Sequence, residues 1–170
     1  MTRVHSPFIL AISASPRGFA FVLFEGPTTP FDWGVKDIRG EKKSAESVAA
    51  IEKLISEYHP SALILEEASK AESKRGPRIR ALLDMIASLA EEEDMPVFRY
   101  SRSDVRETFA EQEARARPEI AEAIATQIPA FMTRLPPVRK LWMSEDPRQS
   151  LFDAAALGLT FFARAKRKKP

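Results

Sequence analysis

The chain of 170 residues, 44% of them hydrophobic and 29% charged, has the size and composition of one globular domain with a full hydrophobic core. It has no cysteine, which excludes disulfides and cysteine catalysis. No apolar run approaches the ~20 residues that span a membrane, and the N-terminus lacks the long apolar stretch of a signal peptide, so we expect a cytoplasmic protein without membrane contact. The net charge is only +2, but basic residues cluster in segments 69–80, 115–118, 136–140 and 164–170, a pattern that suits a polyanion such as nucleic acid and also occurs on solvated surfaces.

The N-terminal part of the sequence predicts three antiparallel strands. Residues 8–12 and 19–24 are apolar runs joined by a turn at Pro16-Arg17-Gly18, and a more mixed strand follows at 31–38. Such closely spaced strands with short turns are typical of a meander.

Helices and strands alternate in the remainder of the chain. The apolar spacing predicts helices over 44–58, 77–92, 101–109, 118–128 and 150–166, and strands over 61–68 and 95–100. Residues 62–65 are apolar at every position, which is typical of a strand covered on both faces, as in a parallel sheet. We therefore predict an α/β domain over residues 1–163, with a mixed sheet flanked by helices, and a basic C-terminal tail at 164–170.

Polar side chains at strand ends are the first candidates for chemistry. Ser13 and Glu66 follow apolar strands, and sites in open α/β sheets form outside the carboxyl ends of strands. Asp153 lies in an apolar helix, where an unpaired carboxylate costs several kcal/mol, so it must face a cleft, find a donor or bind a cation.

Three segments in this order resemble one family. They are "ALILEEA" (62–68), "MPVFRYSRSDVRETF" (95–109) and "LFDAAALGLTFF" (151–162). Over nearly its whole length the chain resembles the RuvC-type Holliday-junction resolvases, which have a ribonuclease H-like fold. The resemblance implies a sheet whose first three strands are antiparallel and whose later strands are parallel.

The resemblance also implies a two-metal phosphodiesterase site with four acidic positions around Mg²⁺ or Mn²⁺. The corresponding residues here are Ser13, Glu66, Ser150 and Asp153, so two acids are replaced by serine. A neutral hydroxyl is a weak ligand for a hard dication. We therefore expect a weak or absent metal site at Glu66 and Asp153, unless Glu145 or Asp146 rebuilds it.

The implied partner is nucleic acid, DNA rather than RNA, and the implied assembly is a homodimer. The residues expected to bind nucleic acid are Lys70, Lys74, Arg75, Arg78, Arg106, Arg115, Arg117, Arg139 and Lys140. Trp142, in a long proline-rich insertion, suits base stacking and equally suits anchoring of a packed loop. The sequence predicts a nucleic-acid-binding relative of the resolvases with impaired catalysis. An active Mg²⁺- or Mn²⁺-dependent structure-selective endonuclease and a protein-interaction scaffold are the alternatives.

Overall fold

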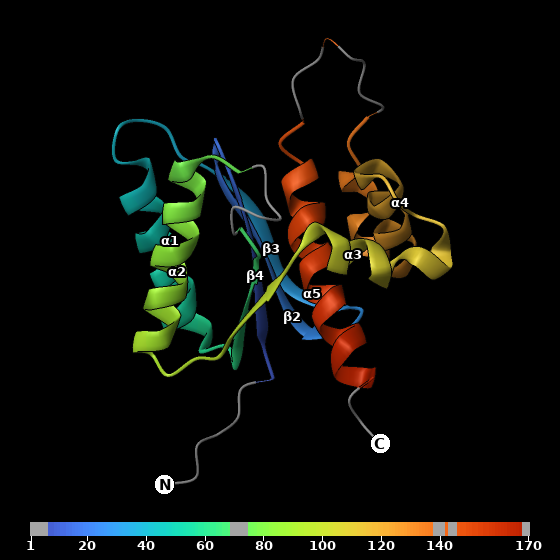
Figure 1. Ribbon diagram of the computed structural model, residues 1–170, viewed down its shortest axis with the longest axis horizontal. Helices are drawn as coiled ribbons and strands as arrows, with labels where there is room; N and C mark the ends of the chain where they lie inside the picture. The colour runs from blue at the N-terminus through green and yellow to red at the C-terminus, as the bar shows by residue number, and fades with distance from the viewer. Residues whose placement is uncertain (1–6, 69–74, 138–141, 143–145, 168–170) are drawn as a thin grey trace, which may run out of the picture.

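The computed structural model describes residues 7–68, 75–137, 142 and 146–167, and these form one five-stranded sheet with helices on both faces (Figure 1). The strands are β1 (Ile9–Ser15), β2 (Gly18–Gly26), β3 (Thr29–Asp37), β4 (Ala62–Glu66) and β5 (Val97–Tyr100), in the order β3-β2-β1-β4-β5. The strands β1, β2 and β3 pair antiparallel, whereas β4 runs parallel to both β1 and β5. The mixed sheet predicted from the sequence is confirmed.

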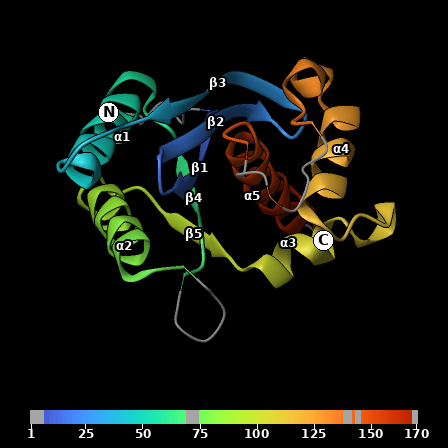
Figure 2. The same cartoon turned by 90° about the horizontal axis from the view of Figure 1, so that it is seen from above.

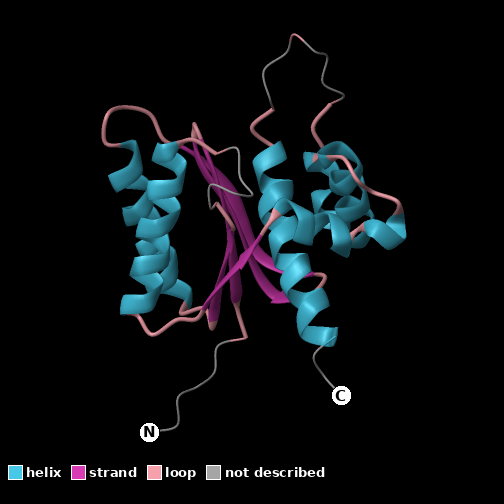
Figure 3. Cartoon of the chain, viewed as in Figure 1, coloured by secondary structure: helices cyan, strands magenta, loops and turns pink. Residues whose placement is uncertain are grey.

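The helices form two layers (Figure 2). One face of the sheet is covered by α1 (Lys43–Tyr58) and α2 (Pro77–Glu92), and the other by α5 (Gln149–Arg167), against which α3 (Arg102–Thr108) and α4 (Arg117–Gln127) pack (Figure 3). Short 3₁₀ helices at Ala110–Gln112 and Pro129–Arg134 connect these elements. Helix α3 begins with a capping box in which Ser101 is the N-cap. No helix in the described part of the chain is long and apolar enough to cross a membrane.

The alternation of side chains along β1 divides the core into two clusters. Leu10, Ile12 and Ala14 pack toward α1 and α2, whereas Ile9 and Ala11 pack toward α5. By the same alternation, the side chain of Ser13 belongs to the α5 face.

Helix α5 lies very close to the sheet. A Cβ atom at Gly158 would stand 2.2 Å from the ring of Phe24 on β2, so only glycine permits this approach. The helix is buried from Gln149 to Thr160 except at Asp153, as its apolar sequence predicts. It continues to Arg167, one residue beyond the predicted helix, so residues 164–167 of the predicted basic tail belong to the helix.

Candidate functional site

The fold brings the four positions implied by the resemblance to one face of the sheet. In the parallel pairing of β1 with β4, Ile9 lies opposite Ala62 and Ala11 opposite Ile64. The same offset places Ser13 beside Glu66. Helix α5, whose first turns carry Ser150 and Asp153, packs against β1 and β4 on this face. Ser13 is 2% exposed and Ser150 is 9% exposed, so the two serines are buried at this edge of the candidate site.

Glu66, at the end of β4, is held by an arginine on both of its oxygens. Arg75 donates from Nε to Oε2 and from Nη2 to Oε1, each at 3.0 Å. The same Nη2 donates to the carbonyl oxygen of Ala14 at 3.1 Å, which ties the pair to the end of β1. This two-pronged geometry is the strongest form of carboxylate–arginine contact.

Asp153 has an equivalent arrangement on α5. Arg117, the first residue of α4, donates from Nε to Oδ1 at 3.2 Å and from Nη2 to Oδ2. The Gln149 amide donates to Oδ1 at 3.2 Å. Of the three alternatives given above for a carboxylate in an apolar helix (a cleft, a donor or a cation), the structure shows hydrogen-bond donors at Asp153.

The residues around Ser150 are also occupied. Its hydroxyl donates to the carbonyl oxygen of Pro147 at 2.7 Å. Asp146 accepts from Arg148 three times, from Nε at 3.0 Å, Nη2 at 2.8 Å and the backbone N–H at 2.9 Å. The Arg148 hydrogen bond is the main cause that lowers the pKa of the Asp146 carboxyl. Asp146, one of the two acids suggested for rebuilding a metal site, is therefore engaged with Arg148, and Glu145 lies outside the described residues.

The donor set does not fit a two-metal centre. A centre that holds two Mg²⁺ or Mn²⁺ ions needs oxygen ligands, and it needs available carboxylates to offset the charge of the two ions. Here both carboxylates are engaged by guanidinium groups on both oxygens, and the other two positions carry neutral hydroxyls. Within the described residues, no three His, Cys, Asp or Glu side chains come together.

The remaining predicted cations lie in three places. Arg78 is exposed near the start of α2 and donates to the carbonyl oxygen of Pro16 at 3.3 Å. Arg106 and Arg115 line a hollow beside α3 and α4 together with Glu107 and Glu119. Lys70, Lys74, Arg139 and Lys140 lie outside the described residues. Trp142 is 79% exposed, which argues against its role as a packed anchor.

Arg75 and Arg117 are predicted from the sequence to bind nucleic acid, but their carboxylate partners are not predictable from it. Arg75 is nine positions from Glu66, and Arg117 is 36 positions from Asp153. The only signal in the sequence was the argument that Asp153 needs a donor.

Comparison with known proteins identifies solved structures that share this fold. No protein-family model and no curated protein matches the sequence. Solved structures do match: Thermus thermophilus RuvC, with 19% identity and a TM-score of 0.65 over 94% of this chain and 96% of that one, and T. thermophilus RuvC in complex with Holliday junction substrate, with 17% identity and a TM-score of 0.67 over 96% and 98%. The yeast mitochondrial Holliday junction resolvase Ydc2 matches with 14% identity and a TM-score of 0.61 over 94% of this chain and 80% of that one. The chain therefore has the RuvC-type resolvase fold, within the ribonuclease H-like class.

Proposed function

We propose that this protein binds nucleic acid, DNA in preference to RNA, through its RuvC-type fold, and that two-metal hydrolysis is lost or feeble. The observation that carries the proposal is the pairing of both retained carboxylates with arginines, beside two serines at the other positions of the resolvase site. The preference for DNA is supported by the T. thermophilus RuvC structure in complex with Holliday junction substrate.

Arginines in this position suit phosphate binding without a metal ion. The guanidinium group binds a phosphate with the same two-pronged geometry as a carboxylate. The side chains of Arg75 and Arg117 are 31% and 34% exposed, so each can meet a ligand from solvent while it contacts its acid. A phosphodiester group that approaches the site would replace the carboxylate as the hydrogen-bond partner of the guanidinium.

The test uses a labelled four-way DNA junction and a linear duplex of matched composition, each incubated with the protein in Mn²⁺ and over a series of salt concentrations. We expect binding that weakens steeply with salt, because phosphate contacts release counterions, and no cleavage. Symmetric cleavage of the junction would contradict the loss of catalysis. Failure to bind either DNA would contradict DNA binding through this fold and would leave RNA or a protein as the partner.

Charge-matched variants connect the binding to the site. The double variant Arg75→Gln/Arg117→Gln should bind more weakly and with a shallower salt dependence than the wild type. Arg102→Gln, which removes one positive charge from an exposed position of α3, is the control. The homodimer implied by the resemblance stays a prediction, and sedimentation of the same samples measures it.

A further inference from the structure

Three basic side chains meet at the turn between β1 and β2. Lys43 Nζ, from α1, and Arg78 Nη2, from α2, both donate to the carbonyl oxygen of Pro16. Arg17 belongs to the turn itself and lines a hollow together with Lys43 and the segment Asp37–Arg39. We call Arg17, Lys43 and Arg78 the turn cluster. Of these residues, only Arg78 was expected to bind nucleic acid, and the structure adds Arg17 and Lys43.

The backbone that carries the cluster is fixed. The N–H of Ile38 donates to the carbonyl oxygen of Arg17 at 2.7 Å, and the N–H of Arg17 donates to Ser15 Oγ at 3.3 Å. Gly18 has a φ of +143°, and a Cβ atom there would stand 2.0 Å from the carbonyl oxygen of Lys36. A fixed turn holds the Pro16 carbonyl in place, and the carbonyl in turn holds the two cations.

The cluster has an uncompensated positive charge. Because Lys43 and Arg78 donate to one oxygen atom, their charged groups lie side by side and repel each other. Among the described residues, no carboxylate lies within ion-pair distance of any member of the cluster. The Asp37 carboxylate, which also lines the hollow, lies 3.6 Å from the Arg39 guanidinium. An anion placed between the two cations would relieve their repulsion.

The turn cluster adjoins the candidate site. The turn begins directly after Ser15, and Arg75, which holds Glu66, donates to the carbonyl oxygen of Ala14. We propose that the turn cluster binds a backbone phosphate of the nucleic acid strand that reaches Arg75. This inference rests on the proposed function and extends it to a second phosphate contact. That contact involves no metal ion and neither carboxylate of the candidate site.

The test measures the affinity of the full chain for the four-way DNA junction as a function of salt, in the variants Lys43→Gln, Arg78→Gln and the double variant. For loss of one phosphate contact, counterion release predicts a roughly eightfold weaker affinity at about 0.1 M salt and a log–log salt slope that is shallower by ~0.9. Lys53→Gln is the matched control for Lys43→Gln, because Lys53 is exposed on the same helix α1 and the substitution removes the same charge. All the substituted side chains are partly or fully exposed, and equal melting temperatures verify that the variants are folded.

The outcomes separate this inference from the proposed function. If the wild type binds the junction and the variants keep its salt slope, as the control does, the turn cluster is not a contact and the inference fails alone. If the wild type binds neither junction nor duplex, the proposed function fails and the inference fails with it. Inorganic phosphate is the second probe. If it raises the melting temperature of the wild type but not of the double variant, while both bind DNA equally, the cluster takes free phosphate and the inference is wrong.

Discussion

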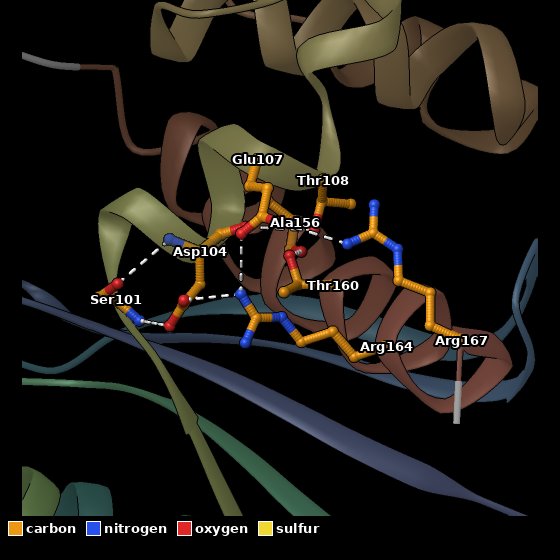
Figure 4. Close-up of polar contacts among 8 residues, drawn as sticks. All are labelled: Ser101, Asp104, Glu107, Thr108, Ala156, Thr160, Arg164 and Arg167. Atoms are coloured by element: carbon orange, nitrogen blue, oxygen red, sulfur yellow. Dashed lines mark hydrogen bonds and ion pairs between the residues drawn. The ribbon is translucent and has the colours of Figure 1, made fainter.

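Arginine–carboxylate pairs occur in two regions of this protein, and the two regions differ in what else holds the carboxylate. One region is the candidate site. The other joins α3 to the end of α5, where Arg164 donates to Asp104 at 2.7 Å and contacts Glu107 at 3.4 Å (Figure 4). The arginines are similarly exposed in both regions, 35% for Arg164 and 31% for Arg75, so exposure does not distinguish them.

The backbone makes the difference. Asp104 accepts from the N–H of Ser101 at 2.8 Å, and Ser101 Oγ accepts from the N–H of Asp104 at 3.1 Å, so this carboxylate is part of a helix cap. In the described residues, by contrast, Glu66 and Asp153 accept from side chains only. A carboxylate fixed by the backbone stabilises the fold, whereas one held by side chains can exchange its partner for a ligand.

The largest effect should follow from a new charge at the candidate site. Ser13→Asp places a carboxylate at a position that is 2% exposed, beside a pair that is already neutral, and should destabilise the protein by roughly 3–5 kcal/mol. Ser15→Asp, at the half-exposed end of the same strand, is the control and should cost much less. Urea denaturation with a chelator measures both.

The same variant tests how far the site is from a metal centre. With Ser150→Asp added, Mn²⁺ should recover part of the lost stability, because all four positions implied by the resemblance then carry carboxylates that can bind the ion. If Ser13→Asp costs no stability, the site is more open to water than its burial indicates, and the contrast with the α3–α5 region weakens.

The α3–α5 region should respond next. Asp104→Ala removes the capping box and the contact with Arg164, and should cost about 1–2 kcal/mol, most of it from the cap because the ion pair is partly exposed. Glu107→Ala, which breaks only exposed pairs with Arg164 and Arg167, should change the free energy of unfolding by less than ~0.5 kcal/mol. Equal losses in the two variants would contradict a special role for the cap.

Acid provides an independent measurement of Asp104. Burial raises the pKa of this carboxyl, but the hydrogen bonds from Ser101 and the Arg164 guanidinium outweigh burial and lower it. Because the pKa is lower in the folded protein, the contribution of Asp104 to stability is complete above its pKa in the unfolded chain, about 3.9. The contribution is lost as the pH falls through the pKa of the folded protein. The difference in stability between wild type and Asp104→Ala should therefore shrink between about pH 4 and pH 2.

The fold was predictable from the sequence because it depends on local patterns, and the site was predictable only in part. The apolar run at 62–65 identified a covered parallel strand, and strand ends located Ser13 and Glu66. The partners of the carboxylates depend on the directions of side chains that lie far apart in the sequence. The same holds for the turn cluster, since Lys43 is 27 positions from Pro16. The end of α5 was predicted within one residue, but the ion pair of Arg164 with Asp104 of α3 was not, because the two residues lie 60 positions apart.

A smaller effect should follow when the candidate site loses a charge. Glu66→Gln weakens the hold on Arg75, and the affinity for the four-way junction should rise severalfold, with a salt slope steeper by up to ~0.9. Glu25→Gln removes the same charge from an exposed position of β2 and is the control for overall charge. Weaker binding by Glu66→Gln would show that the carboxylate positions Arg75 for the ligand and does not compete with it.

The smallest effect tests a carboxylate that is held without an arginine. Tyr58 Oη donates to Asp32 Oδ2 at 2.7 Å, and this hydrogen bond, with burial and the Asp32 charge, raises the pKa of Tyr58 to about 12. The contribution of this hydrogen bond to stability is therefore complete below the pKa of tyrosine in the unfolded chain, about 10, and is lost as the pH rises from there to about 12. The variant Tyr100→Phe leaves Tyr58 as the only tyrosine, so the absorbance of tyrosinate reports its titration directly.

In that background, Asp32→Asn should move the titration of Tyr58 back toward the ordinary pKa of tyrosine. Near neutral pH, Tyr58→Phe should lower the free energy of unfolding by only ~1 kcal/mol. If Asp32→Asn leaves the titration unchanged, burial alone sets the pKa, and the hydrogen bond to Asp32 does not stabilise the fold.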